Sequence, residues 1–173
     1  MEDFLAPDFG GSEPSGRHMA IICSKGNLDM AYPGLILANA ALGEGVEVDL
    51  FFTFWGFDMI MTDRADDMAF SPAGNAAMRL PVGNIRMPQA LAPAPGMTGM
   101  ATRMLKKQIA ELGVPTVPDF LDQIVASGGR LWACRMSADM FHVKEEDLRD
   151  DVGGIISAAD FIEKTEGAQI LFI

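Results

Sequence analysis

Residues 19–54 read MAIICSKGNLDMAYPGLILANAALGEGVEVDLFFTF, and this stretch decides the fold. Residues 19–23 and 46–54 are short apolar runs of the kind that form buried strands. Between them apolar side chains recur at helical spacing, at Leu28, Ala31, Leu35, Ala38 and Leu42. A strand, a helix and a strand in succession form a βαβ unit, so we expect a parallel sheet covered on both faces.

The rest of the chain continues this alternation. Apolar periodicity predicts helices over 97–112, 118–128 and 157–167, with short helices over 57–62 and after Ser137. Further strands are expected at 130–134, 151–156 and 168–173. Five strands separated by helices indicate the doubly wound α/β class.

Domain organisation follows from composition. Residues 1–18 are rich in Gly, Pro, Ser and acidic side chains, and we expect them to form a flexible tail. Residues 19–173 are expected to form a single domain. Five prolines fall within residues 57–96, which predicts a long insertion in that domain.

The overall charge excludes some functions. The 173 residues carry 24 acidic and 13 basic side chains, for a formal net charge of −11. Nucleic acids and anionic lipid surfaces attract basic proteins, so neither is an expected partner. No apolar run approaches the ~20 residues of a membrane span, and residues 1–18 lack the apolar core of a signal peptide. Two cysteines do not make a secreted disulfide framework, and we expect a cytoplasmic location.

Three loops follow the first three expected strands. Parallel sheets bind ligands at the carboxyl ends of their strands, which directs attention to residues 24–27, 54–56 and 134–137. Candidate binding residues there are Lys25, Trp55, Arg135, Met136 and Ser137. Cys134 carries the most reactive side chain of the set and is the candidate catalytic residue.

A helix beginning near Ser137 would favour the thiolate form of Cys134, because helix amides and the helix dipole stabilise a negative charge there. Arg135 could add positive charge, and nearby methionines could form a polarisable wall. A thiolate in this position could attack a sulfur atom and hold it as a persulfide. The alternative is an inert buried cysteine, and for Cys23, inside an apolar strand, a packing role is favoured.

Other catalytic and metal-binding patterns are missing from the sequence. There is no Walker loop and no Gly-x-Gly-x-x-Gly motif after a strand. Cys134, Asp139 and His142 could be imagined as metal ligands, but the chain has only two histidines. The methionine stripe of 97–112 is more often core than a copper site. We therefore expect no metal and no cofactor.

Four stretches together resemble the DsrE/DsrF-like family, and specifically its DsrE-like sulfurtransferases, sometimes labelled peroxiredoxin family proteins. They are FFTFWG at 51–56, GMTGMATRM at 96–104, ACRMSADM at 133–140 and the closing LFI at 171–173. The resemblance extends from Met19 to Ile173. The sequence contains no peroxidatic cysteine motif, so the peroxiredoxin label has no support from the residues.

The resemblance implies a flavodoxin-like, three-layer α/β/α fold with a five-stranded, mainly parallel sheet, and homo-oligomers. It also implies sulfur trafficking, in which Cys134 accepts sulfane sulfur from a small persulfide carrier or a rhodanese-type donor and passes it to another protein. Family members usually have Met-Gly where this chain has Met140-Phe141, so the cover over the thiol is expected to differ. The alternatives are a small-ligand-binding module without turnover and a structural subunit of a larger complex.

Overall fold

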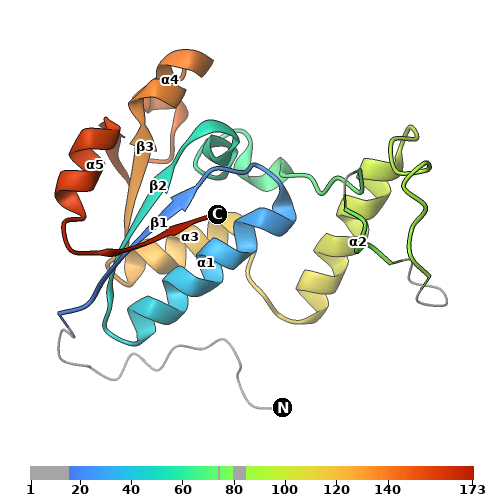
Figure 1. Cartoon of the computed structure of the whole chain (residues 1–173), viewed down its shortest axis with the longest axis horizontal. Coiled ribbons are helices and arrows are strands. Elements are labelled where there is room, and N and C mark those ends of the chain that lie inside the picture. The colour runs from blue at the N-terminus through green and yellow to red at the C-terminus, as the bar shows by residue number, and fades with distance from the viewer. Residues whose placement is uncertain (1–15, 74, 80–84) are drawn as a thin grey trace. The chain divides into compact units, whose positions relative to one another are not determined.

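The computed structural model describes residues 16–73, 75–79 and 85–173. Its centre is a sheet of five strands, all parallel, in the order β4-β3-β2-β1-β5 (Figure 1). The strands are β1 (His18–Cys23), β2 (Glu47–Phe52), β3 (Arg130–Cys134), β4 (Val152–Ile156) and β5 (Gln169–Phe172). The predicted α/β class and parallel sheet are confirmed.

Helices cover both faces of the sheet, because a parallel strand pair needs a crossover connection between its strands. On one face α1 (Leu28–Gly43) packs beside α3 (Val117–Ala126). On the other face α5 (Ala158–Lys164) places Phe161 against Phe51 of β2, with ring centroids 4.4 Å apart. The short helix α4 (Arg135–Phe141) continues directly from β3.

The strand register aligns apolar side chains in the core between the sheet and the helices α1 and α3. Ile21, Leu50 and Leu131 are hydrogen-bonded neighbours across β1, β2 and β3, and each is almost completely buried. Neighbours in a parallel sheet point to the same face, so the three form one continuous apolar row. Burying each side chain contributes roughly 1.5–3 kcal/mol to the stability of the fold. This burial stabilises the sheet from which the loops at the carboxyl edge extend.

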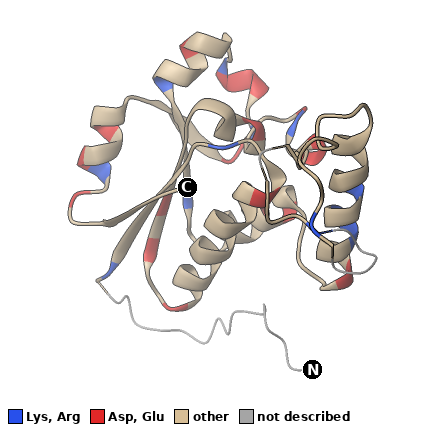
Figure 2. Ribbon diagram, turned by 45° about the vertical axis from the view of Figure 1, so that its right-hand side comes forward, with Lys and Arg blue, Asp and Glu red and all other residues tan. Residues whose placement is uncertain are grey.

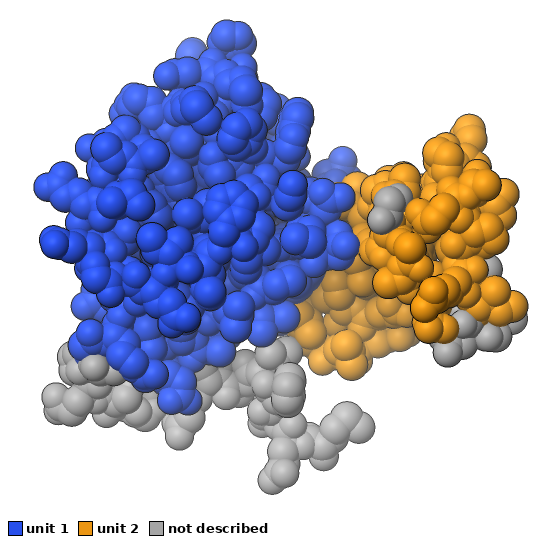
Figure 3. Space-filling view, viewed as in Figure 1, with its two compact units in different colours: residues 1–68, 115–173 blue, residues 69–114 orange. Residues whose placement is uncertain are grey.

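Residues 69–114 form a second compact unit, separate from the unit of residues 1–68 and 115–173 (Figure 3). Its main element is α2 (Met97–Glu111), whose Thr102 hydroxyl accepts a hydrogen bond from the backbone N–H of Phe70 at 2.9 Å. The predicted insertion covered 57–96, whereas residues 57–68 belong to the first unit, in the 3₁₀ helices η1 (Phe54–Met59) and η2 (Ala65–Asp67). We predicted a tail that ends at residue 18, but β1 already begins at His18. The first fifteen residues of the predicted tail lie outside the described part of the chain.

Candidate functional site

Cys134 is the last residue of β3 and the residue immediately before α4, in the N-cap position. Its side chain is buried, with 4% of its area exposed. The thiol of Cys134 is therefore closed to solvent in this structure. The thiol does lie where a strand gives way to a helix, although α4 has only 7 residues.

The start of α4 differs from the prediction, and this changes the role of Ser137. The helix begins at Arg135, so Ser137 lies inside its first turn and does not cap it. The Ser137 side chain is fully buried, and its Oγ accepts a 2.8 Å hydrogen bond from the backbone N–H of Phe54. A second hydrogen bond of 3.1 Å joins Ser137 Oγ and Thr53 Oγ1. Ser137 therefore ties α4 to the carboxyl end of β2.

Phe54 has an unusual backbone at the point where Ser137 holds it. Its φ angle is +47°, in the left-handed region that bulky residues rarely adopt. Such a conformation costs of order 1–3 kcal/mol and persists only where the surroundings impose it. The sequence directed attention to the loop 54–56 but missed the conformation of Phe54, because no pattern in a single sequence marks a phenylalanine for it.

An aromatic pair lies next to this connection. Trp55 is 62% exposed, and its ring lies 5.1 Å from that of Phe141, the last residue of α4. Phe57 also approaches Phe141, with ring centroids 6.4 Å apart. Phe141 is the residue that departs from the pattern of the resembling family, and here it anchors Trp55 against α4.

The first two strand-end loops touch one another. A Cβ on Gly26 would lie 2.5 Å from the backbone oxygen of Trp55, and a Cβ on Gly56 would lie 2.1 Å from the backbone oxygen of Cys23. Only glycine permits this approach of backbone to backbone. Lys25 is exposed on the first of these loops, so the structure brings the predicted Lys25 and Trp55 to adjacent loops.

Arg135 and Met136 follow Cys134 and are exposed. The Arg135 guanidinium donates a 2.5 Å hydrogen bond to the backbone oxygen of Ile155 in β4, which fixes the side chain against the neighbouring strand. Met136 and Met140 are 58% and 48% exposed. With Phe54 and Trp55 they make an apolar rim at the carboxyl edge of the sheet.

Cys23 is unsuited to act with Cys134. It is buried on the face of the sheet that packs on α1, where its Sγ lies 3.5 Å from the position of a Cβ on Gly34. Burial raises the pKa of the Cys23 thiol to about 12. Strand alternation places Cys134 on the opposite face, and β2 separates the two strands. Both cysteines are free thiols, and the packing role predicted for Cys23 agrees with this environment.

A pocket of about 330 Å³ lies at the far end of α4. Its walls come from residues 61–64, 141–143, 146 and 147, including Arg64 and His142. His142 has a left-handed backbone, with φ +56°, at the end of the helix. Among the described residues no three His, Cys, Asp or Glu side chains are grouped to hold a metal.

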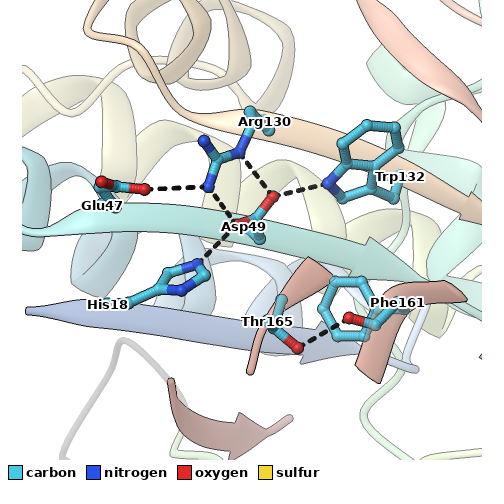
Figure 4. Close-up of polar contacts among 7 residues, drawn as sticks. All are labelled: His18, Glu47, Asp49, Arg130, Trp132, Phe161 and Thr165. Carbon is cyan, nitrogen blue, oxygen red and sulfur yellow. Dashed lines mark hydrogen bonds and ion pairs between the residues drawn. The ribbon is translucent and has the colours of Figure 1, made fainter. Parts of the chain in front are cut away.

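Sequence reasoning also missed a polar network on the α5 face (Figure 4). The Asp49 carboxylate, 1% exposed, accepts hydrogen bonds from Arg130 Nε at 2.8 Å and Nη2 at 2.6 Å, and from Trp132 Nε1 at 2.6 Å. His18 Nε2 lies 2.6 Å from the same carboxylate. Burial alone would raise the pKa of Asp49, but the hydrogen bonds from Arg130, Trp132 and His18 lower it below its usual range. This network joins β1, β2 and β3 at the edge opposite Cys134.

The fold and the site define a parallel α/β protein whose candidate reactive group is a thiol at the carboxyl edge of the sheet. The model of the DsrE/DsrF/DrsH-like family matches residues 15–173, and the chain belongs to that family. It is 34% identical over 158 residues to the sulfur carrier protein DsrE2 of Allochromatium vinosum, covering 91% of this chain and 98% of that protein.

Two further comparisons give a second relative and a similar fold. The uncharacterized protein YrkE of Bacillus subtilis is 29% identical over 162 residues, covering 91% of this chain and 97% of YrkE. The protein of unknown function MTH1491 from Methanobacterium thermoautotrophicum has a similar structure, with a TM-score of 0.55 at 9% identity over 91% of this chain and 99% of that one. The second likeness concerns the fold alone. No helix in the part of the chain that the structure describes is long and apolar enough to cross a membrane.

Proposed function

We propose that the protein carries sulfane sulfur as a persulfide on Cys134 and passes it to another protein. The observation that supports this most is the position of Cys134, where β3 gives way to α4 at the carboxyl edge of the sheet. The chain belongs to a family with a relative named as a sulfur carrier. Cys23, the other thiol, has a pKa raised to about 12 and is a poor nucleophile at neutral pH.

The proposed reaction is a thiol–persulfide exchange. The Cys134 thiolate attacks the outer sulfur of a donor persulfide, R–S–SH, and an S–S bond forms as the donor S–S bond breaks. The donor leaves as R–S⁻, and Cys134 becomes Cys134–S–SH, with the proton retained on the transferred sulfur. No net oxidation occurs, so the exchange needs no cofactor. An acceptor thiolate then repeats the attack on the outer sulfur of Cys134.

Burial of Cys134 sets a condition on this exchange. With 4% of the side chain exposed, the donor sulfur reaches the thiol only when the surrounding side chains open. Met136, two residues along and 58% exposed, has the flexible side chain suited to such a movement. A closed thiol also shields a bound persulfide from water and oxidants between transfers.

The donor and acceptor in this proposal are proteins, of the small persulfide carrier or rhodanese type. The apolar rim of Phe54, Trp55, Met136 and Met140 offers exposed surface beside the thiol for such a partner. We place the protein in the cytoplasm, where thiols stay reduced, and we include self-association of the chain in the proposal. The reaction class is sulfurtransferase, with the chain acting as an intermediate carrier.

A transfer experiment tests the proposal. A rhodanese-type donor is loaded with radiolabelled sulfane sulfur and mixed with the chain, and the label on each protein is followed after rapid separation. We expect the label to move to the wild type and to Cys23→Ser, and to be absent from Cys134→Ser. Trp55→Ala should slow transfer from the protein donor while leaving loading by inorganic polysulfide unchanged, because the small reagent needs no docking surface.

The outcomes separate the alternatives. Transfer that is equal in Cys134→Ser would place the chemistry elsewhere and would overturn the proposal. No transfer to the wild type, together with a stable complex between the chain and another protein on sizing, would favour a structural subunit instead.

A further inference from the structure

The charges of the chain are divided unequally between its two compact units. Residues 69–114 contain five basic residues and one acidic residue, a net charge of +4, whereas the other 127 residues contain 8 basic and 23 acidic residues, a net charge of −15. The basic residues of the second unit are Arg79, Arg86, Arg103, Lys106 and Lys107, and Figure 2 shows blue segments along α2. Two surfaces of opposite sign within one chain can attract each other between copies.

The second unit also exposes apolar side chains. Ile85, Leu91, Met100 and Leu112 are 61%, 57%, 49% and 77% exposed. The only buried residue of the 15-residue helix α2 is Ala101. In water an isolated helix of this length is marginally stable, and most helices are stabilised by packing of an apolar face. The second unit therefore presents exposed apolar side chains together with its positive net charge.

A surface with matching properties lies on the first unit, around the pocket at the end of α4. Met61, Phe141 and Val143 give the pocket apolar walls, and Asp63, Glu146 and Asp147 give it acidic ones. Residues 58–67 and 139–151, which include the pocket walls, carry ten acidic and three basic side chains. We name this region the acidic pocket face. Of its apolar side chains Phe141 is partly exposed, whereas Met61 and Val143 are buried, so this face offers the second unit mainly negative charge.

We infer that the second unit of one copy docks on the acidic pocket face of a second copy of the chain. The inference rests on the self-association included in the proposed function, and it names the surfaces that carry it. A second copy fits better than an anionic lipid surface, because the remaining −15 charge of the chain would be repelled by lipid. Since two different surfaces meet, the contact is either made twice in a two-fold dimer or repeated around a closed ring.

Sedimentation equilibrium of the full chain tests this inference, using charge changes on each side. The variants are Lys106→Glu with Lys107→Glu on the second unit, Glu145→Lys with Glu146→Lys on the acidic pocket face, and all four together. The wild type should sediment above the 18.6 kDa monomer at low salt and dissociate at high salt. Each pair should weaken association at least tenfold, and the four changes together should restore most of it. Glu163→Lys with Glu166→Lys, exposed on and after α5, is the matched charge control and should leave association unchanged.

Three results would overturn the inference: a monomeric wild type at low salt, association that neither charge pair weakens, or no recovery in the combined variant. Flotation with phosphatidylglycerol vesicles covers the lipid alternative, and binding that Lys106→Glu with Lys107→Glu abolishes would replace the second copy by a membrane. Polysulfide loading of Cys134 is measured on the same samples. Loss of loading with intact association counts against the proposed function alone, and loss of association with intact loading counts against the docking surface alone.

Discussion

The backbone N–H of Phe54 donates a 2.8 Å hydrogen bond to the buried Oγ of Ser137, and this bond joins the loop after β2 to the helix that follows Cys134. Phe54 has a left-handed φ of +47°, so the bond holds a strained residue in place. The position of the helix start at Cys134 and the shape of the neighbouring loop are therefore coupled through one hydroxyl group.

Replacement of Ser137 tests this coupling. Ser137→Ala removes the acceptor of the Phe54 N–H and the bond to Thr53, and leaving a buried N–H unpaired costs about 1–3 kcal/mol. We expect a loss of that size in urea unfolding, with slower sulfur loading of Cys134. Thr53→Val removes only the shared hydroxyl contact and should cost less, with positive coupling in the double-mutant cycle. Equal effects of the two single changes would show that the Phe54 bond has no special role.

Close contact between the first two strand-end loops gives a second prediction. Gly56→Ala places a Cβ 2.1 Å from the Cys23 backbone oxygen, so the loops must separate and the free energy of unfolding should fall by more than about 2 kcal/mol. Gly99→Ala is the matched control, because its Cβ meets nothing within 4 Å inside α2. It should be neutral or stabilise by up to about 1 kcal/mol. Thermal unfolding of both variants checks the contrast, and similar melting temperatures would refute it.

The network around Asp49 predicts a pH dependence of stability. Asp49→Asn removes the charge that Arg130 and His18 face, and breaking a buried ion pair costs about 3–5 kcal/mol. Since the Arg130 side chain is 44% exposed, the lower end is expected. The pKa of Asp49 is lowered in the folded protein, so its contribution is complete above the unfolded pKa, about 3.9, and is lost as the pH falls through the folded value. Urea unfolding of wild type and variant should therefore differ at pH 7 and converge in acid, and a difference independent of pH would contradict this.

Burial of Cys23 predicts that it resists alkylation. Burial raises the pKa of Cys23 to about 12, so its thiolate form is rare at pH 8. Native Cys134→Ser, in which Cys23 is the only thiol, should stay unmodified by iodoacetamide at that pH and react fully in denaturant. Mass spectrometry of the quenched samples reads the result. Rapid modification of the native variant would mean that Cys23 is accessible.

Much of the fold could be predicted because local apolar patterns indicate the alternation of strands and helices. The spacing from Leu28 to Leu42 matched α1, and the apolar run 130–134 matched β3 residue for residue. The second compact unit could not be outlined in this way. The apolar period of 97–112 matched α2, but the prolines and small residues before it have no period, and the boundary at residue 69 depends on which contacts form in three dimensions.

The candidate site was predicted in outline, because parallel topology brings strand ends together whatever their sequence. Lys25 and Trp55 follow β1 and β2 on chain segments that touch, and Cys134 ends β3, the strand beside β2. The hydrogen bond between Phe54 and Ser137, which holds the strained Phe54, and the ring contact between Trp55 and Phe141 each join residues roughly 80 positions apart. Local patterns contain no information on such pairs. The burial of Cys134 likewise depends on packing around α4 that only the folded chain reveals.

Location of the transferred sulfur is the most direct test of the account. The chain is incubated with inorganic polysulfide, freed of excess reagent and analysed by intact mass and by peptide mapping without reduction. We predict one added sulfur atom on Cys134 in the wild type and in Cys23→Ser, removed by cyanide or dithiothreitol, and none in Cys134→Ser. Added sulfur that persists in Cys134→Ser, or a wild type that gains none, would contradict the assignment of Cys134 as the carrier.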